Sequence, residues 1–287
     1  MLKRILVLFG MILMISLAAC SGSEETLKKD NETNASSHQT EHQEKKVSPS
    51  KNKENDDQNK QDNDEEMDEE KQKFAEKKYK VDTNSWSIVP LEDQIEEKVA
   101  LLTIDDAPDN HAVEMAKTLK ELDVNAIFFV NGHFLETDED KGKLKEIYDM
   151  GFLIGNHTYS HAFLPDLSEQ EQKEEIVKVS DMVEEITGER PKFFRAPNGA
   201  NTDYSKQVAD KEGMILMNWT YGFDWEPEYQ TKEAITDIMV NTEYLNDGAN
   251  LLMHDRKWTA AGLHDIVRGL EEKGYEIVDP NSIQTKE

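Results

Sequence analysis

Two adjacent carboxylates, Asp105 and Asp106, end an apolar run that begins at Val99. A short apolar run that stops at turn-forming residues is typical of a buried strand, and strand-based α/β enzymes place their chemistry at the carboxyl ends of strands. Because successive side chains of an extended chain point to opposite sides, the two carboxylates can do different jobs. Asp and Pro also end strands that have no catalytic role, so the pair alone leaves both interpretations open.

Two histidines further along the chain have a spacing found among metal ligands. His157 and His161 lie four residues apart, which on a helical turn would place both imidazoles on one side. With a carboxylate from a neighbouring strand, they would form a set that suits Zn²⁺, and also Co²⁺, Ni²⁺ or Fe²⁺, with positions left for water and substrate. A lone pair of histidines at this spacing is more often structural, and the nearby Asp pair strengthens the metal interpretation.

Polar residues follow at least five of the expected strands. Besides 105–106, they occupy the segments 156–161, 195–199, 223–225 and 254–255. In a parallel α/β fold the carboxyl ends of the strands lie on one face, so residues as distant as Asp105 and His254 can converge there. This coincidence is the main sequence observation that favours a catalytic site.

Alternating strand and helix patterns must position these residues. The sequence predicts strands over 99–106, 125–130, 152–157, 192–196, 214–220, 250–254 and 275–278. Helices are predicted over 110–122, 141–150, 168–186, 203–212, 231–245 and 259–273. The alternation indicates parallel strands joined by right-handed crossovers, in either an open doubly wound sheet or an incomplete barrel.

The charge of the chain excludes one broad class of function. The 287 residues include 33 basic and 60 acidic side chains, and residues 81–287 alone carry 19 basic and 43 acidic ones, a net charge of −24. Such a surface should repel polyanions and attract cations, so nucleic acid is not an expected partner.

The amino-terminal residues have the layout of a bacterial export signal. Lys3 and Arg4 precede an apolar run from Ile5 to Leu17, which is short for a membrane span. The ending Leu17-Ala18-Ala19-Cys20, with the only cysteine of the chain, resembles a lipobox. The resemblance implies cleavage of a signal peptide over 1–19 and lipid attachment to Cys20, which would anchor the protein at the extracellular face of the cell membrane. An ordinary signal peptide or an uncleaved anchor are the alternatives.

The next segment, over 20–80, is rich in charged and polar residues and poor in apolar ones. It cannot bury enough apolar surface to offset the entropy of ordering, so we expect a disordered tether. The composition changes near Val81, where we place the start of a folded domain over 81–287.

Five segments of this domain, in order, resemble the motifs of the polysaccharide deacetylase family, the NodB-homology domain of carbohydrate esterase family 4. They are Thr103-Ile104-Asp105-Asp106-Ala107-Pro108, His157-Thr158-Tyr159-Ser160-His161, Arg195-Ala196-Pro197-Asn198-Gly199, Asp224-Trp225 and Leu252-Met253-His254. The resemblance covers about residues 95–280. It implies a distorted, incomplete (β/α) barrel of about seven parallel strands. Two departures are Ala107 in place of Gly and Asn198 in place of Tyr.

The family resemblance also implies a role for each site residue. Asp106, His157 and His161 would bind the metal, with Zn²⁺ the first expectation, and Asp105 would act as general base, held by Arg195. His254 would act as general acid supported by Asp224, although the loose spacing here also allows Asp224 to be an ordinary loop residue. The backbone N–H of Asn198 would hold the oxyanion, and Trp225 and Leu252 would wall a pocket for the acetyl methyl.

The expected activity is therefore metal-dependent N-deacetylation of N-acetylglucosamine-type polysaccharide, in peptidoglycan or a related cell-envelope glycan. The same scaffold could instead remove O-acetyl groups or cleave a smaller cyclic amide. A non-catalytic glycan-binding lipoprotein with a decayed site is the alternative from another class. The intact set of acidic, basic and histidine residues argues against decay.

Overall fold

The computed structural model describes residues 76–286. The predicted signal peptide, Cys20 and residues 21–75 of the predicted tether lie outside the described residues. Within the described part of the chain, no helix is both long and apolar enough to cross a bilayer.

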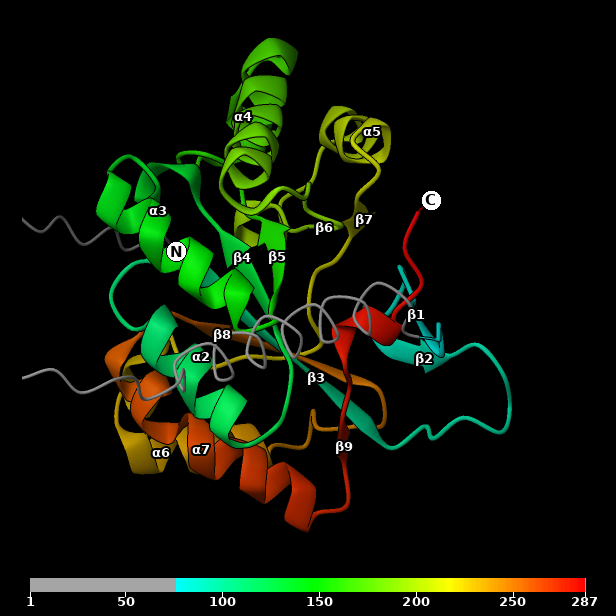
Figure 1. Ribbon diagram of the computed structural model, residues 1–287. Helices are drawn as coiled ribbons and strands as arrows, with labels where there is room; N and C mark the ends of the chain where they lie inside the picture. Colours follow the sequence, from blue (N-terminus) through cyan, green and yellow to red (C-terminus); the bar gives the residue numbers. More distant parts are fainter. Residues whose placement is uncertain (1–75, 287) are drawn as a thin grey trace, which may run out of the picture. The chain divides into compact units, whose positions relative to one another are not determined.

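A seven-stranded parallel sheet forms the centre of the domain (Figure 1). Its order is β7-β6-β5-β4-β3-β8, with β9 also paired to β3. The strands are β3 (Val99–Ala107), β4 (Ile127–Val130), β5 (Leu153–Asn156), β6 (Phe193–Phe194), β7 (Ile215–Leu216), β8 (Ala249–His254) and β9 (Glu276–Ile277). The prediction of about seven parallel strands is confirmed.

The two edges of the sheet, β7 and β8, are connected only by a segment without regular strand structure. The predicted strand over 214–220 is wrong in its length, because only Ile215–Leu216 are strand. The carbonyls of Met217 and Asn218 accept hydrogen bonds from the side chain of Arg195, so they do not join a strand ladder. An isolated parallel bridge between Tyr221 and Leu251 then connects this segment to β8. The distorted, incomplete barrel is thereby confirmed over the open doubly wound sheet.

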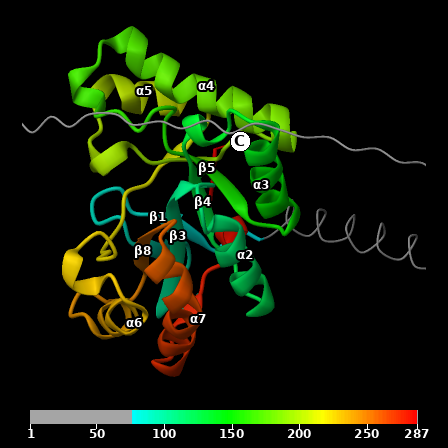
Figure 2. The same ribbon diagram turned by 90° about the vertical axis from the view of Figure 1, so that its left-hand side faces the viewer.

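Within residues 76–286, six α-helices cover the outer face of this sheet. They are α2 (Ala112–Glu121), α3 (Asp138–Asp149), α4 (Glu169–Thr187), α5 (Asp203–Lys211), α6 (Lys232–Asn241) and α7 (Lys257–Glu272). Each packs on the next in the order α5-α4-α3-α2-α7-α6, which follows the order of the strands (Figures 1 and 2). Ser168 and Glu171 form a capping box at the start of α4. Helix α3 begins three residues earlier than predicted, because Thr137 caps it.

The alternation of side chains along β3 separates two apolar layers. Leu102 and Ile104 belong to the core between sheet and helices, whereas Val99 and Leu101 belong to a smaller core on the inner face. Since side chains alternate along a strand, Asp105 follows Leu101 on the inner face, at the carboxyl end of the strand.

A short antiparallel hairpin covers the amino-terminal end of the inner core. Its strands are β1 (Tyr79–Val81) and β2 (Ile88–Pro90), and the N–H of Ile88 donates to the carbonyl of Gly248, directly before β8. Tyr79 also forms a bridge with Ile283 near the end of the chain. Tyr79 and Lys80, which precede the expected boundary at Val81, thus belong to this hairpin.

Candidate metal and catalytic site

The buried ion pair of Asp105 and Arg195 lies at the centre of the site. Arg195 has an exposed fraction of 0%, and its Nη1 donates to Asp105 Oδ1 at 2.6 Å and to the Thr103 hydroxyl at 2.8 Å. Its guanidinium also stacks on the ring of Phe129. Burial lowers the pKa of Arg195 and the negative charge of Asp105 opposes that effect. The pair holds the Asp105 carboxylate in one orientation, as the prediction for these two residues requires.

Asp106, His157 and His161 meet beside this ion pair. One potential ligand atom from each residue lies within 4.8 Å of the others. Asp106 Oδ1 is 3.6 Å from His161 Nε2 and 3.9 Å from His157 Nε2. The three residues predicted as ligands are thus close enough to share one divalent metal ion.

The hydrogen bonding of His157 fits a metal ligand. Its Nδ1 lies 2.8 Å from the carbonyl oxygen of Arg195, and because that oxygen only accepts, Nδ1 must carry the proton. The unprotonated Nε2 then lies 3.5 Å from Asp105 Oδ2 and 3.9 Å from Asp106 Oδ1, beside both carboxylates. Burial lowers the pKa of His157, although the charges of Asp105 and Asp106 oppose this, and the neutral imidazole is the form that binds metal.

The two histidines converge for a different reason from the one expected. The segment 157–163 contains no helical turn. Instead, Thr158 and His161 adopt left-handed backbone conformations, with φ of 66° and 58°, and the two imidazole centroids lie 5.0 Å apart. Asp106 also has a positive φ of 61°. Such conformations are uncommon for residues other than glycine and gather at functional sites.

His254 and Asp224 form a second charged pair at the end of β8. His254 Nδ1 lies 2.6 Å from Asp224 Oδ1, and Asp224 Oδ2 accepts from the His254 backbone N–H and from the Thr259 hydroxyl. Burial lowers the pKa of His254, but the hydrogen bond and negative charge of Asp224, with Asp105 and Asp106 further away, outweigh it. The pKa of His254 is therefore raised above its ordinary value. Asp224 is fully buried and lies against His254, as its predicted role requires, rather than on an open acidic loop.

The three predicted substrate contacts lie around these pairs. Asn198 has a φ of 56°, and its backbone N–H has no hydrogen-bond acceptor among residues 76–286. Trp225 is 44% exposed and stands edge-on to His254, with ring centroids 5.7 Å apart. Leu252 is buried and is paired with Thr103 across the sheet. An open N–H and an exposed aromatic ring suit an oxyanion and a sugar, respectively.

Asp255 holds the segment that follows Asp106. Its buried carboxylate accepts from the four backbone N–H groups of residues 109–112, at the start of α2, and its own N–H donates to the carbonyl of Asp105. Burial raises the pKa of Asp255, and the hydrogen bonds from the backbone oppose that effect. Asp255 has no role predicted from the sequence, because a buried Asp that accepts from the start of a distant helix has no local sequence signal.

Arg256 was also missed. Its Nη2 lies 3.2 Å from Asp106 Oδ2. It follows His254 by two positions, and its N–H donates to the His254 carbonyl in a tight turn. Its place directly after a strand that ends in a site residue was the signal that could have identified it.

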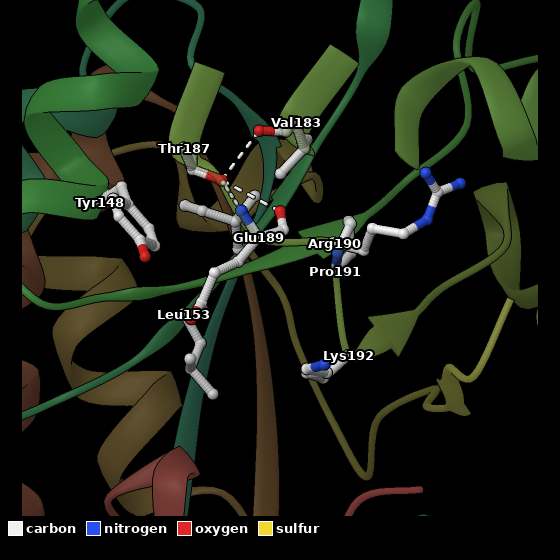
Figure 3. Close-up of a pocket in the computed structure, with 9 residues that line it drawn as sticks. Tyr148, Leu153, Val183, Thr187, Glu189, Arg190, Pro191 and Lys192 are labelled. Carbon is white, nitrogen blue, oxygen red and sulfur yellow. Dashed lines mark hydrogen bonds between the residues drawn. The ribbon is translucent and has the colours of Figure 1, made fainter. Parts of the chain in front are cut away.

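A small pocket elsewhere in the domain is not part of the site. Figure 3 shows the cavity lined by Leu153, Val183, Thr187 and Lys192, among others. Leu153 starts β5 and Lys192 precedes β6, so this cavity lies toward the amino ends of the strands. The charged pairs lie at the opposite, carboxyl ends.

Comparison with known proteins identifies the family of the chain. The family model described as polysaccharide deacetylase matches residues 92–217. A peptidoglycan-N-acetylglucosamine deacetylase of Bacillus cereus is 30% identical over 63% of this chain and 69% of its own length. The peptidoglycan-N-acetylmuramic acid deacetylase PdaC of Bacillus subtilis is 29% identical over 68% of this chain and 41% of its own.

Two solved structures show the same fold. The B. subtilis peptidoglycan deacetylase PdaC has a TM-score of 0.56 and 30% identity, over 64% of this chain and 88% of that one. A pseudoenzyme of carbohydrate esterase family 4 from Bacillus anthracis has a TM-score of 0.59 and 27% identity, over 66% and 67%. The chain belongs to the polysaccharide deacetylase family. The match of the family model ends before β8, so the place of His254 and Asp224 in this site rests on the geometry.

Removal of a predicted ligand should weaken metal binding. Loss of an outer hydrogen-bond partner of a ligand commonly lowers metal affinity 10–100-fold, so His157→Ala or His161→Ala should lower Zn²⁺ affinity by at least about 100-fold. Calorimetric titration of the metal-stripped chain measures this directly. The matched control is His264→Ala, an exposed histidine on α7 whose loss should leave affinity unchanged. Wild-type affinity in both His157→Ala and His161→Ala would contradict the assignment.

Proposed function

We propose that this chain hydrolyses the acetamide of N-acetylated amino sugars in peptidoglycan or a related cell-envelope glycan, with a divalent metal, most simply Zn²⁺. One observation carries the proposal. A carboxylate fixed by a buried arginine, a three-residue metal-ligand set and a carboxylate-supported histidine converge at the carboxyl ends of the strands. Named relatives of the chain act on N-acetylglucosamine or N-acetylmuramic acid in peptidoglycan.

Hydrolysis of an amide needs activated water, a stabilised oxyanion and a protonated leaving group. A metal held by Asp106, His157 and His161 would supply Lewis-acid polarisation of the acetamide carbonyl and a lower pKa for the attacking water. As the oxygen of the water forms a bond to the carbonyl carbon, Asp105 takes a proton from the water. Arg195 keeps the Asp105 carboxylate in the orientation for this step. The Asn198 N–H donates to the carbonyl oxygen as negative charge develops there.

The second half of the reaction depends on His254. As the carbon–nitrogen bond breaks, protonated His254 donates the Nε2 proton to the departing amine, while Asp224 accepts from Nδ1 and stabilises the cation. The products are acetate and a sugar with a free amine. Trp225, exposed beside His254, offers an aromatic face to the sugar.

A binding role without catalysis is the second candidate, because a solved neighbour of the same family is a pseudoenzyme. Family membership alone therefore does not establish activity. The charged groups that hydrolysis needs are all in place here, which favours the enzyme. O-Acetyl groups are an alternative substrate for the same residues, since ester hydrolysis uses the same water, base and oxyanion donor.

Acetate release tests the proposal. The metal-stripped full chain, reloaded with Zn²⁺ or Co²⁺, should release acetate from N-acetylglucosamine oligomers or purified peptidoglycan. Asp105→Asn removes the general base without removing a ligand, so the rate should fall by at least about 100-fold while Zn²⁺ affinity persists. An O-acetylated xylan offered in parallel distinguishes the esterase. Glycan binding without acetate from any substrate would favour the non-catalytic candidate.

The pH dependence of the rate should report the Asp224–His254 pair. His254 must be protonated to act as acid, so kcat/KM should fall as the pH rises through its pKa. Because Asp224 raises that pKa, Asp224→Asn should move the fall to lower pH. Asp265→Asn, an exposed carboxylate that contacts His264, is the matched control and should leave the profile unchanged. An unchanged profile in Asp224→Asn would remove His254 as the acid.

The site of action follows from the amino-terminal sequence, and we place the enzyme at the outer face of the cell membrane through lipidated Cys20. The support is the lipobox-like ending of an apolar segment. The wild-type chain should fractionate with membranes, and Cys20→Ala should appear in the soluble fraction or the medium. Equal membrane retention of both chains would contradict the anchor.

A further inference from the structure

An exposed cation, Arg256, lies beside the site of a domain whose net charge is strongly negative. The Arg256 side chain is 44% exposed and contacts Asp106 Oδ2. Residues 81–287 carry a net charge of −24, whereas Asp105 and Asp224 in the site are paired with Arg195 and His254. The charge of the domain opposes the approach of an anionic substrate, and a cation at the edge of the site offsets that repulsion locally.

The two carboxylate oxygens of Asp106 face different groups. Oδ1 points to the two imidazoles, at 3.6 and 3.9 Å, and Oδ2 accepts from Arg256 Nη2 at 3.2 Å. Arg256 therefore does not occupy the oxygen that faces the other ligands. The contact holds the guanidinium at the edge of the site and remains compatible with metal binding.

Most N–H groups of the Arg256 guanidinium have no acceptor in the described part of the chain. Within residues 76–286, the Arg256 side chain has no hydrogen-bond acceptor besides Asp106. The other three arginines of this part of the chain are committed, since Arg190 binds three carboxylates, Arg195 is buried and Arg268 pairs with Glu271. The planar fork of an arginine matches a carboxylate with two parallel hydrogen bonds.

We infer that Arg256 forms an anion subsite that binds a carboxylate carried by the sugar next to the one bearing the acetamide, or by the same sugar. This inference rests on the proposed function, and it names the substrate class as an acidic N-acetylated glycan. The named relatives include deacetylases of N-acetylglucosamine and of N-acetylmuramic acid. The two sugars differ by a lactyl carboxylate on the ring carbon beside the acetamide, so a cation at the edge of the site can distinguish them.

The test compares substrates that differ only in charge. Glycan strands freed of peptide, with lactyl carboxylates free or converted to methyl esters, are offered to the metal-loaded full chain. Arg256→Gln should raise KM for the free acid by about 10-fold or more and leave the ester unchanged, because a charge-assisted hydrogen bond is lost only with the acid. Strands that retain peptide distinguish a peptide carboxylate from the lactyl one.

Two controls separate this role from a structural one. Lys257→Gln, the exposed neighbour at the start of α7, should leave both substrates unaffected, and Zn²⁺ affinity of Arg256→Gln should stay within a few-fold of wild type. Equal losses on acid and ester, or a large change in Zn²⁺ affinity, would show that Arg256 only supports Asp106 and would overturn the subsite.

The outcome for the subsite is separable from that for the enzyme. If the wild-type chain released no acetate, calorimetric binding of the acid and ester strands would still test the subsite. Tighter binding of the acid that disappears in Arg256→Gln supports it even without turnover. Equal binding of the two strands by the wild-type chain overturns it.

Discussion

The buried guanidinium of Arg195 is the constraint on which the site depends. A charge without solvent is costly unless paired and hydrogen-bonded, and this one is satisfied by Asp105, Thr103 and the carbonyls of Met217 and Asn218. These partners come from β3 and from the irregular segment after β7. The single side chain therefore connects two sides of a barrel whose sheet is incomplete between them.

The backbone of the same residue reaches the metal-ligand set. The carbonyl of Arg195 accepts from His157 Nδ1, which fixes the tautomer of that imidazole. Arg195 thus orients the base through its side chain and a ligand through its main chain. Arg195 therefore sets the position of Asp105 relative to His157. A displacement of Arg195 would move both groups together.

Much of the fold could be predicted from the sequence because strands and helices alternate with clear breakers. Gly188, for example, ends α4 in a left-handed conformation, which glycine adopts without strain. The residues of the site could be predicted from their positions after strands, which a parallel sheet brings to one edge. The predictions that were wrong concerned features that depend on contacts between residues distant in the sequence. Strand β7 is short because the carbonyls that follow it bind Arg195. The left-handed conformations of Thr158 and His161 could not be predicted, because neither position is a glycine.

The hairpin of β1 and β2 lies at the end of the domain opposite to the site. Tyr79 and Ile88 pack at the amino ends of the strands, against the start of β8 and the last residues of the chain, while the charged pairs lie at the carboxyl ends. The first described residues therefore lie on the side of the domain away from the site. A polymer that enters the site would therefore meet the domain at the end opposite the hairpin, and the two ends of the barrel present different chemistry: apolar packing at one and paired charges at the other.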